Sequence, residues 1–559
     1  NGGVTSLVYD TADRVLSVTD PRSLTTSYSY NGFGDVLQIV SPDSGTTVRT
    51  FDANSNLITS TDARGLVNTR AYDALSRLTS IAFNGGGESY VYDLGAFGIG
   101  RLAQVSGTGN STQFSYDIQG RLVQKQQTVG ANVLTEAFTF NAGGQLASIA
   151  YPSGMTVGYQ YDLAGQVSGL TVNGAAFMTS VVHEPFGPAR SWNWGSQAYA
   201  RPHDADGRVA SFPLGAATRT LSYDAASQIT GYADSTGSSQ AFAYDLLGQL
   251  TRFTSGATSE QFGYDLDGNR TSLTTGTGTT TYGISSSSNQ LLTQRRPNAR
   301  YVYDAAGNLT TNGSLSFTYD ALSRMTVSVN GTAKKGTTAY TTNGLGQRVQ
   351  KSGAAGTTTF LYGSGSQLMG EYTGASAQET IYLDGMPVGL YNNGTLLRIY
   401  ADQLGAPRAI TNAVGVTQWA WDGDPFGNVA PTGSLTFNQR FPGQYADAET
   451  GLFFNHARYY DPKIGRYTQS DPIGLAGGAN SYAYVRNRLT QRIDRLGMSD
   501  RWPDWANSTY RDVSYDTPRL SDVESSAAAD FFRTLKTDSL TLAPFFYASG
   551  AEPAGLLLS

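Results

Sequence analysis

The side chains that could do chemistry in this chain of 559 residues are mainly carboxylates. The chain has no cysteine and only three histidines, His183, His203 and His456, which lie far apart without an H-x-x-x-H pair. This excludes a thiolate metal site and disfavours a histidine-based one, so we expect neither a metal nor a cofactor. Nothing marks partners for His456 in a Ser-His-Asp arrangement. Acid chemistry remains, because two carboxyl groups that share a proton can hydrolyse a peptide bond.

Many of the aspartates belong to a short repeat: an aromatic residue, Asp or Asn, two variable residues, Gly or Ser, then Arg, Gln or Asn, then an aliphatic residue. Successive Asp positions lie 20 or 21 residues apart where the repeat is most regular, as from 52 to 73 and from 224 to 245 to 265. The copies include Phe51-Asp52, Tyr72-Asp73, Tyr116-Asp117, Phe140-Asn141, Tyr161-Asp162, Tyr223-Asp224, Tyr244-Asp245, Tyr264-Asp265 and Tyr303-Asp304. A constant period of this length indicates a repeat architecture.

Calcium binding by the Asp residues and carbohydrate stacking on the Tyr rings are two functional alternatives for this repeat. Each repeat supplies mainly one carboxylate, whereas a calcium loop needs several oxygen ligands. A Tyr in every repeat is more simply explained as part of the core of a sheet. We therefore expect the repeated Asp residues to be structural turn residues.

Each repeat is predicted to form a hairpin in which alternating residues such as Gln113–Tyr116 lead into an Asp-x-x-Gly turn. The Asp side chain can accept backbone N–H groups two residues on, and Gly tolerates positive φ. The Arg or Gln that follows should cross to a neighbouring turn, and the Tyr ring should pack beside the next aromatic ring. Because one hairpin is unstable alone, we expect an all-β fold in which many hairpins form one long, coiling antiparallel sheet.

Composition supports this fold and narrows the function. The chain has 65 Gly, 34 Tyr and 24 Phe with only 15% charged residues, and its net charge is -6. There is no basic field to attract phosphates, so nucleic-acid binding by the chain as a whole is disfavoured. No run of about eighteen apolar residues occurs. Residue 1 is Asn and no signal peptide follows, so we expect the chain to begin within a longer protein or after processing, without its targeting segment.

The Tyr-Asp-x-x-Gly-Arg-Leu repeats resemble the YD repeats of Rhs proteins, of teneurins and of the C component of insecticidal toxin complexes. After residue 375 they give way to a stretch that is similar to the Rhs repeat-associated core. Its motifs are, in order, Tyr400–Arg408, Asp424–Gly427, Arg440–Tyr445, Glu449–Leu452, Ala457–Pro462, Gly465–Tyr467 and Ser470–Leu475. The resemblance implies a hollow β shell formed by residues 1–374, a core at 375–498 that closes it, and an enclosed toxin that begins in residues 499–559.

In this family the core also cuts the chain after a motif of the form D-P-x-G-L, which residues Asp494 to Met498 match in part. The resemblance therefore implies a cut between Met498 and Ser499. Arg495 replaces the family's Pro, and Met498 replaces its Leu. Met is a close apolar replacement, but the loss of Pro frees the backbone, so cleavage could be slowed or lost.

The resemblance implies that Asp471 and Asp494 are the two acids of a single-turnover aspartic peptidase. Arg458 could orient or charge-stabilise them, and Asp461 is a further candidate carboxylate, although both also suit a structural Arg–Asp network. From their spacing alone, Asp471 and Asp494 are better explained as turn caps. Only with the resemblance does catalysis become the favoured interpretation.

The segment 499–559 differs from the rest because the repeats stop and residues 525–536 are predicted to be helical. Five basic against nine acidic residues disfavour a nuclease that depends on phosphate attraction. The apolar residues 540–548 could contact a membrane or form part of a core. We interpret the segment as the N-terminal part of an effector.

The favoured function is a self-cleaving shell that encloses a toxin and is exported by bacteria to act on competing bacteria or on hosts. Its partners would be its own effector, a secretion apparatus such as a type VI system, and an immunity protein, and the shell itself is expected to be monomeric. The alternative is a cell-surface or wall-associated adhesion protein that is not cut. A sugar-cleaving enzyme is a third possibility, but no carboxylate pair for it is identifiable outside the core.

Overall fold

The computed structural model describes residues 2–185, 187–331 and 336–500. These residues form an almost entirely β structure, as the sequence predicts. The tail, including the helix expected at residues 525–536, lies outside the described residues. The helical elements in the described part are two short 3₁₀ turns, η2 (Gly474–Gly477) and η3 (Val485–Asn487).

The strands form three long sheets in succession and one small sheet. The first sheet consists of β1 (Ser6–Tyr9), β2 (Val15–Thr19), β3 (Thr25–Tyr30), β4 (Val36–Ser41), β5 (Gly45–Phe51), β6 (Leu57–Thr61), β7 (Val67–Tyr72), β8 (Leu78–Phe83), β9 (Gly86–Tyr92), β10 (Leu102–Gly107), β11 (Asn110–Tyr116), β12 (Leu122–Val129), β13 (Asn132–Phe140), β14 (Leu146–Ala150), β15 (Thr156–Tyr161), β16 (Val167–Val172), β17 (Ala175–His183), β18 (Ala189–Trp194) and β19 (Gln197–Ala200). The second consists of β20 (Ser211–Leu214), β21 (Ala217–Tyr223), β22 (Ile229–Asp234), β23 (Ser239–Tyr244), β24 (Leu250–Ser255), β25 (Thr258–Tyr264), β26 (Arg270–Thr275), β27 (Gly278–Ile284), β28 (Leu291–Arg295) and β29 (Ala299–Arg300).

The third sheet consists of β30 (Val302–Tyr303), β31 (Leu309–Thr311), β32 (Leu315–Tyr319), β33 (Met325–Asn330), β34 (Thr337–Thr342), β35 (Arg348–Gly353), β36 (Gly356–Tyr362), β37 (Leu368–Thr373), β38 (Ser376–Leu383), β39 (Met386–Asn392), β40 (Thr395–Ala401), β41 (Pro407–Thr411), β42 (Thr417–Ala420) and β43 (Thr432–Gly433). It continues across residue 375, where the sequence repeats give way to the core motifs. The small sheet consists of β44 (Tyr445–Ala446), β45 (Phe453–Asn455), β46 (Arg458–Asp461) and β47 (Arg466–Tyr467).

The hairpin turns have the chemistry that the sequence predicts. In the repeat at Asp73, one carboxylate oxygen accepts the N–H groups of Leu75 (2.9 Å) and Arg77 (3.0 Å). Arg77 pairs with Asp73 at 2.6 Å and crosses to Asp93 of the next repeat, also at 2.6 Å. Its guanidinium lies 4.5 Å from the ring centre of Tyr92, so a cation–π contact occurs where we expected two aromatic rings to pack.

Two further features recur in these hairpins and were not expected from the sequence. Tyr72 pairs with Leu78 while Ala71 pairs with Ser80, which leaves Thr79 as an extra residue in a β-bulge. The Tyr72 hydroxyl donates to the carbonyl oxygen of Leu57 in the preceding repeat, at 3.1 Å. The same bulge and hydroxyl bond occur at Tyr116, Tyr161, Tyr223, Tyr244 and Tyr264. Because a bulge increases local twist, its repetition bends the sheet steadily in one direction.

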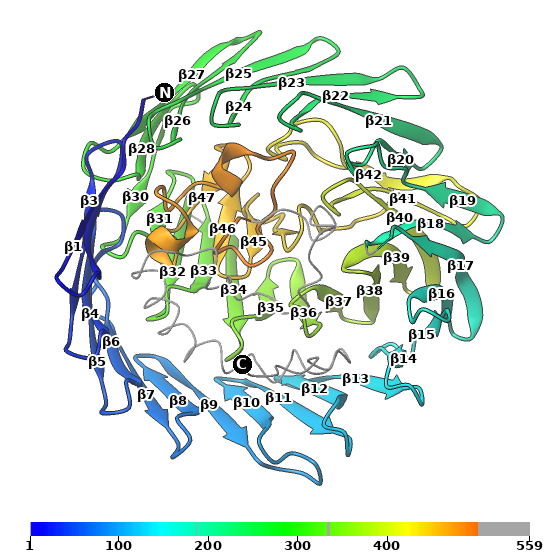
Figure 1. The fold of residues 1–559 in the computed structure, drawn as a ribbon, viewed down its shortest axis with the longest axis horizontal. Coiled ribbons are helices and arrows are strands. Elements are labelled where there is room, and N and C mark those ends of the chain that lie inside the picture. The colour runs from blue at the N-terminus through cyan, green and yellow to red at the C-terminus, as the bar shows by residue number, and fades with distance from the viewer. Residues whose placement is uncertain (1, 186, 332–335, 501–559) are drawn as a thin grey trace, which may run out of the picture.

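The bending winds the sheets into a spiral, seen in Figure 1 as an outer wall with later strands inside it. Contacts between the two turns of the spiral join residues that are far apart in sequence. The sequence separation of the two partners falls along the chain, from 266 residues for Arg22–Ser288 to 237 residues for Lys125–Tyr362 and 203 residues for Gln197–Tyr400. The second turn therefore needs fewer residues than the first, as a turn lying inside it would.

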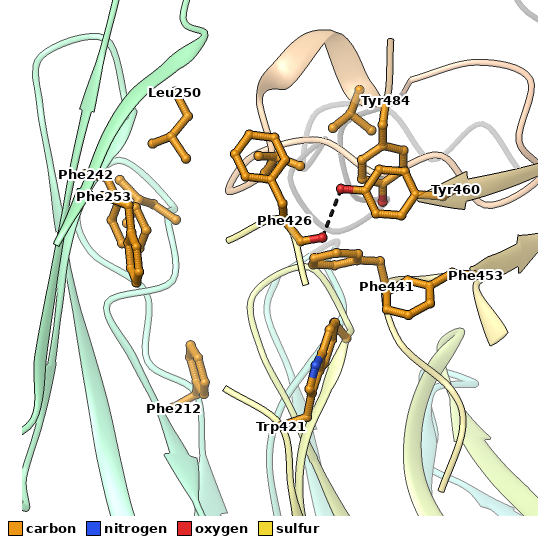
Figure 2. Close-up of a cluster of buried hydrophobic side chains, with 14 of the residues drawn as sticks. Phe212, Phe242, Leu250, Phe253, Trp421, Phe426, Phe441, Phe453, Tyr460 and Tyr484 are labelled. Carbon is orange, nitrogen blue, oxygen red and sulfur yellow. Dashed lines mark hydrogen bonds between the residues drawn. The ribbon is translucent and has the colours of Figure 1, made fainter. Parts of the chain in front are cut away.

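An aromatic cluster attaches the small sheet and its loops to the wall (Figure 2). The wall contributes Phe212, Phe242, Leu250 and Phe253, which face a group of rings from the C-terminal part of the chain. That group contains Trp421, Phe426, Phe441, Phe453, Tyr460 and Tyr484. The Tyr460 hydroxyl donates to the carbonyl oxygen of Phe426 at 2.9 Å, so this buried polar group is satisfied. The packing fixes the C-terminal loops relative to the wall.

Candidate active site

Three segments that follow one another in the C-terminal part of the chain meet in one buried place. Strand β46 begins with Arg458, the loop after β47 carries Asp471, and the last described segment carries Asp494. Arg458 Nη2 lies 2.8 Å from Asp471 Oδ2 and 3.4 Å from Asp494 Oδ2. All three side chains are at most 4% exposed. The structure thus brings together the two acids named from the sequence, with one guanidinium between them.

Backbone contacts fix the arginine and the first acid. Arg458 Nη1 donates to the Ser481 carbonyl oxygen at 2.8 Å, and Nε donates to the carbonyl oxygen of Gly497. Asp471 Oδ1 accepts the N–H of Ile473 at 3.0 Å, which is the turn-capping role that spacing alone suggested. Its Oδ2 contacts Arg458, so this residue caps a turn and is linked to the second acid through the guanidinium group.

Asp494 binds the N–H group of the Met498–Ser499 peptide bond and the N–H group of the peptide bond before it. Its Oδ1 accepts the N–H of Met498 at 3.0 Å and the N–H of Ser499 at 3.3 Å. On the other side, a methyl group placed on Gly477 would lie 2.3 Å from Asp471 Oδ2 and 2.7 Å from the carbonyl oxygen of Met498. These two oxygens therefore border the same small space. One acid contacts the nitrogen of this peptide bond, and Oδ2 of the other lies no more than about 5 Å from its carbonyl oxygen.

Burial dominates the protonation of both acids. It raises the pKa of Asp471 to about 8, although Arg458 opposes this shift. Burial also raises the pKa of Asp494, against Arg458, the Tyr467 hydroxyl and the two backbone N–H groups. Because Asp494 accepts more hydrogen bonds than Asp471, it is better suited to remain ionised. The pair therefore combines a proton donor with a proton acceptor, as an aspartic hydrolase requires.

Sequence reasoning missed two side chains of this site. Tyr467 donates to Asp494 Oδ2 at 2.7 Å, and its ring centre lies 3.7 Å from the Arg458 guanidinium. Asn455 donates to the Tyr467 hydroxyl at 2.7 Å and to the Asp494 carbonyl oxygen at 2.8 Å. Tyr467 belongs to a motif that the sequence singles out, Gly465–Tyr467, but nothing in its spacing indicates a contact with a residue 27 positions away.

The structure does not bring Asp461 to this site. Arg458 and Asp461 are the first and last residues of the four-residue strand β46, so their side chains point to opposite faces. Asp461 Oδ1 instead accepts the N–H of Lys463 at 3.0 Å in the turn that follows. His456 is half-buried near the rings of Tyr362 and Phe454, and desolvation lowers its pKa to about 4.

Residues 2–185, 187–331 and 336–500 contain no group of three or more His, Asp or Glu side chains arranged to hold a metal ion. Over the same residues, no helix is both long and apolar enough to cross a membrane.

Comparison with known proteins places the chain in a family. The Teneurin YD-shell model matches residues 98–231 and 216–476, and the RHS Repeat model matches residues 9–46. Double-stranded DNA deaminase toxin A of Burkholderia cenocepacia is 27% identical over 329 residues, which are 51% of this chain and 22% of that protein. Toxin protein Tse5 of Pseudomonas aeruginosa is 41% identical over 100 residues, 18% of this chain and 8% of that protein.

Probable deoxyribonuclease RhsB of Dickeya dadantii is 52% identical over 59 residues, 11% of this chain and 4% of that protein. The matches thus span less than a quarter of the length of each of these three relatives. Among solved structures, TcdB2-TccC3 superimposes with a TM-score of 0.77 at 18% identity, over 89% of this chain and 31% of that one. The Photorhabdus luminescens Tc holotoxin pore gives the same TM-score over 89% and 30%. With the family model covering more than half of its residues, the chain belongs to the teneurin YD-shell family and carries RHS repeats.

Proposed function

We propose that this chain is the shell of a polymorphic toxin, which cuts itself between Met498 and Ser499 to free a C-terminal effector. The observation that carries the proposal is the position of this peptide bond between two acids. Its N–H lies 3.3 Å from Asp494 Oδ1, and its carbonyl oxygen borders the same space as Asp471 Oδ2.

The reaction would follow the chemistry of two acids that share a proton. Asp494, as the carboxylate, takes a proton from water while the water oxygen bonds to the carbonyl carbon of Met498. Asp471, as the carboxylic acid, donates its proton to the Met498 carbonyl oxygen. When this intermediate collapses, the carbon–nitrogen bond breaks, Asp494 returns its proton to the Ser499 nitrogen, and Asp471 regains its own. The products are a carboxyl group on Met498 and an amino group on Ser499.

Arg458 would hold the two acids at a working distance. Its guanidinium pairs with both carboxyl groups, and its Nε–H group binds the Gly497 carbonyl oxygen one residue before the cut. This single side chain therefore links both acids to the peptide that would be cut. Because the substrate is part of the same chain, even a slow acid pair would complete its one turnover.

The role of the shell as a carrier is supported by the variety of its relatives. Their names give a double-stranded DNA deaminase, a probable deoxyribonuclease and a tRNA3(Ser)-specific nuclease, all with stretches similar to this chain. Similar stretches beside different named activities fit a common carrier joined to a variable effector. We propose that the chain is exported by a bacterium, with the effector, a secretion apparatus and an immunity protein as its partners.

The test is the intact mass of the full chain under denaturing conditions. We expect two fragments that divide between Met498 and Ser499, and a single uncut species from Asp494→Asn and from Asp471→Asn. Asp461→Asn is the matched control, because this carboxyl is buried in the same region but faces away from the site. It should be cut like the unchanged chain. An unchanged chain that stays whole would contradict the proposal and favour an adhesion protein that is not cut.

A further inference from the structure

The second residue after the proposed cut has a binding site of its own. Asp500 Oδ2 lies 2.7 Å from Arg492 Nη1, and Asp500 Oδ1 lies 3.2 Å from Arg486 Nε. The Asp500 side chain is only 6% exposed, although it belongs to the last described residue before the tail. An aspartate at this point would ordinarily extend into solvent, so its burial between two guanidinium groups needs an explanation.

The backbone around Arg486 is specially shaped. Val485, Arg486 and Asn487 have φ values of 43°, 52° and 60°, a left-handed conformation that L residues seldom adopt in succession. The flanking residues hold it in place, because Val485 is buried and Asn487 Nδ2 donates to the Gly268 carbonyl oxygen of the wall at 2.8 Å. The wall and the aromatic cluster thus maintain a strained turn whose central residue contacts Asp500.

The surroundings carry an excess of positive charge. Arg488 lies close to both arginines, and its pKa is lowered by burial and by the charges of Arg492 and Arg486, whereas Asp500 opposes this shift. Asp245 also opposes the shift, so Asp500 is one of two carboxylates that offset the charge of these guanidinium groups. Without an anion at this place, the mutual repulsion of the three guanidinium groups would be larger.

We propose that Arg486 and Arg492 form a carboxylate-binding subsite for the second residue after the cut, which aligns the scissile bond. The inference rests on the proposed self-cleavage and adds a preference to it, for Asp or Glu at this position. Asp494 fixes the N–H groups of Met498 and Ser499, and the subsite fixes Asp500, so the chain is held on both sides of Ser499. A bond anchored in this way stays within reach of both acids.

The same contacts have a consequence after the cut. The new amino group of Ser499 is positively charged and lies beside Asp494, while Asp500 remains paired with the two arginines. The effector therefore stays attached to the shell by three ion pairs at its new N-terminus. Such an attachment weakens as salt concentration rises, because ions screen charges that are not fully buried.

The experiment compares the full-length chain with Asp500→Asn, Asp500→Glu and the double variant Arg486→Gln/Arg492→Gln. The cut fraction is followed by intact mass during cell-free synthesis, and attachment is measured as the salt concentration at which the fragments separate on a native sizing column. Asp500→Asn and the double variant should be cut more slowly, by a factor of up to about ten, because each loses one side of a charged pair. Their fragments should separate at lower salt. Asp500→Glu should keep both properties.

Arg208→Gln is the control, because Arg208 pairs with Asp204 and Asp206 on the wall, in a comparable but unrelated ion pair. Normal cutting and normal salt dependence in both Asp500→Asn and the double variant would overturn the subsite while leaving self-cleavage intact. If the unchanged chain is not cut at all, the proposal of self-cleavage is contradicted, and so is the proposal that the subsite aligns the scissile bond. Variants that lose activity must keep the unfolding temperature of the parent, and Arg486→Gln alone, at a side chain 56% exposed, provides a milder test.

Discussion

Tyr467 donates a 2.7 Å hydrogen bond to one oxygen of Asp494, whose other oxygen accepts the N–H groups of Met498 and Ser499. Hydrogen bonds to both oxygens thus fix the orientation of the carboxyl group. The same tyrosine ring lies 3.7 Å from the Arg458 guanidinium, so one side chain positions two members of the site.

Replacing Tyr467 by Phe should slow self-cleavage without preventing folding. The hydrogen bond from the hydroxyl lowers the pKa of Asp494. Without it, a larger fraction of Asp494 is protonated at neutral pH and cannot accept a proton from water. A lost hydrogen bond to a charged group corresponds to about tenfold in rate. A time course of intact mass measures this. Tyr460→Phe, which removes a hydroxyl bond to a carbonyl oxygen elsewhere in the core, should not slow the cut. Equal slowing in both would point to general destabilisation.

Self-cleavage should fall as pH rises through about 8. Burial raises the pKa of Asp471 to about 8, so the proton that it donates is lost above this value. The same shift affects stability. The pKa in the folded state exceeds the ordinary value of 3.8, so this residue favours folding most at low pH, and its contribution declines as pH rises from about 4 to about 8.

Cut fractions between about pH 6 and pH 10 test the first effect, and urea midpoints of Asp471→Asn and Asp494→Asn between about pH 4 and pH 9 test the second. The Asp471→Asn chain should lose the part of the decline that extends to about pH 8, which the Asp494→Asn chain retains. A cut fraction that is flat across pH 8 would mean that Asp471 is not the donor.

Gly477→Ala should abolish cleavage while the shell still folds. The added methyl group would lie closer to Asp471 Oδ2 and to the Met498 carbonyl oxygen than non-bonded atoms approach, so the peptide bond must move away from the acid. Gly276→Ala is the control, because nothing lies within 4 Å of a methyl group at that position. Intact mass and thermal unfolding of both variants decide the matter. Normal cutting in Gly477→Ala would show that this space is not used.

Arg495→Pro should accelerate the cut. Proline fixes φ just after Asp494 and lowers the entropy of the segment that must stay in place, an effect of about 0.4–1 kcal/mol and hence roughly two- to fivefold in rate. Arg495→Ala serves as the control for loss of the side chain. If the proline variant is cut more slowly than the alanine variant, the backbone at this position does not fit proline.

Arg219 should be important for joining the wall to the C-terminal region. It is buried and pairs with Asp234 at 2.7 Å and Asp422 at 2.6 Å. Arg219→Ala would leave two carboxylates without their partner, at a cost of about 3 kcal/mol, the lower limit for breaking a buried pair since Asp422 is partly exposed. Urea unfolding measures this loss.

Acid should reduce the difference between Arg219→Ala and the unchanged chain. Arg219 holds the pKa of Asp422 below its ordinary value, so the stabilisation is present above about pH 4 and disappears as the carboxyl is protonated. A difference that stays constant down to about pH 3 would mean that the arginine stabilises by packing alone.

Much of the wall was predictable from the repeat, and the parts that were not have a physical reason. Asp73 and Arg77 make the expected turn because their contacts are local. The bulge at Thr79 and the Tyr72 hydroxyl bond were missed, because register and cross-repeat contacts depend on how neighbouring hairpins align. The coiling direction of the sheet follows from such details and has no signature in a single repeat.

Some residues of the candidate active site were also predictable from the sequence, and others were not. Asp471 and Asp494 were predicted through the motifs that surround them, and the structure places both beside Arg458. Asp461 is only three residues from Arg458, but the alternation of a strand turns it away. Tyr467 could not be assigned from sequence, because its contact with Asp494 depends on how two loops fold against each other.

Residues of the first turn of the spiral contact particular residues of the second turn, and the number of residues between such partners falls along the chain. This matching fixes the circumference of both turns. If one hairpin repeat were inserted after Arg64 in the first turn only, Glu88 and every later residue of that turn would face the wrong hairpin of the second. Arg324 would lose Glu88, and Asp422 would lose Arg219. Open solenoids can gain or lose repeats at little cost because each unit contacts only its neighbours. Here the circumference can change only if both turns change together, so the internal dimensions should be inherited as a unit even where the sequences of individual repeats diverge.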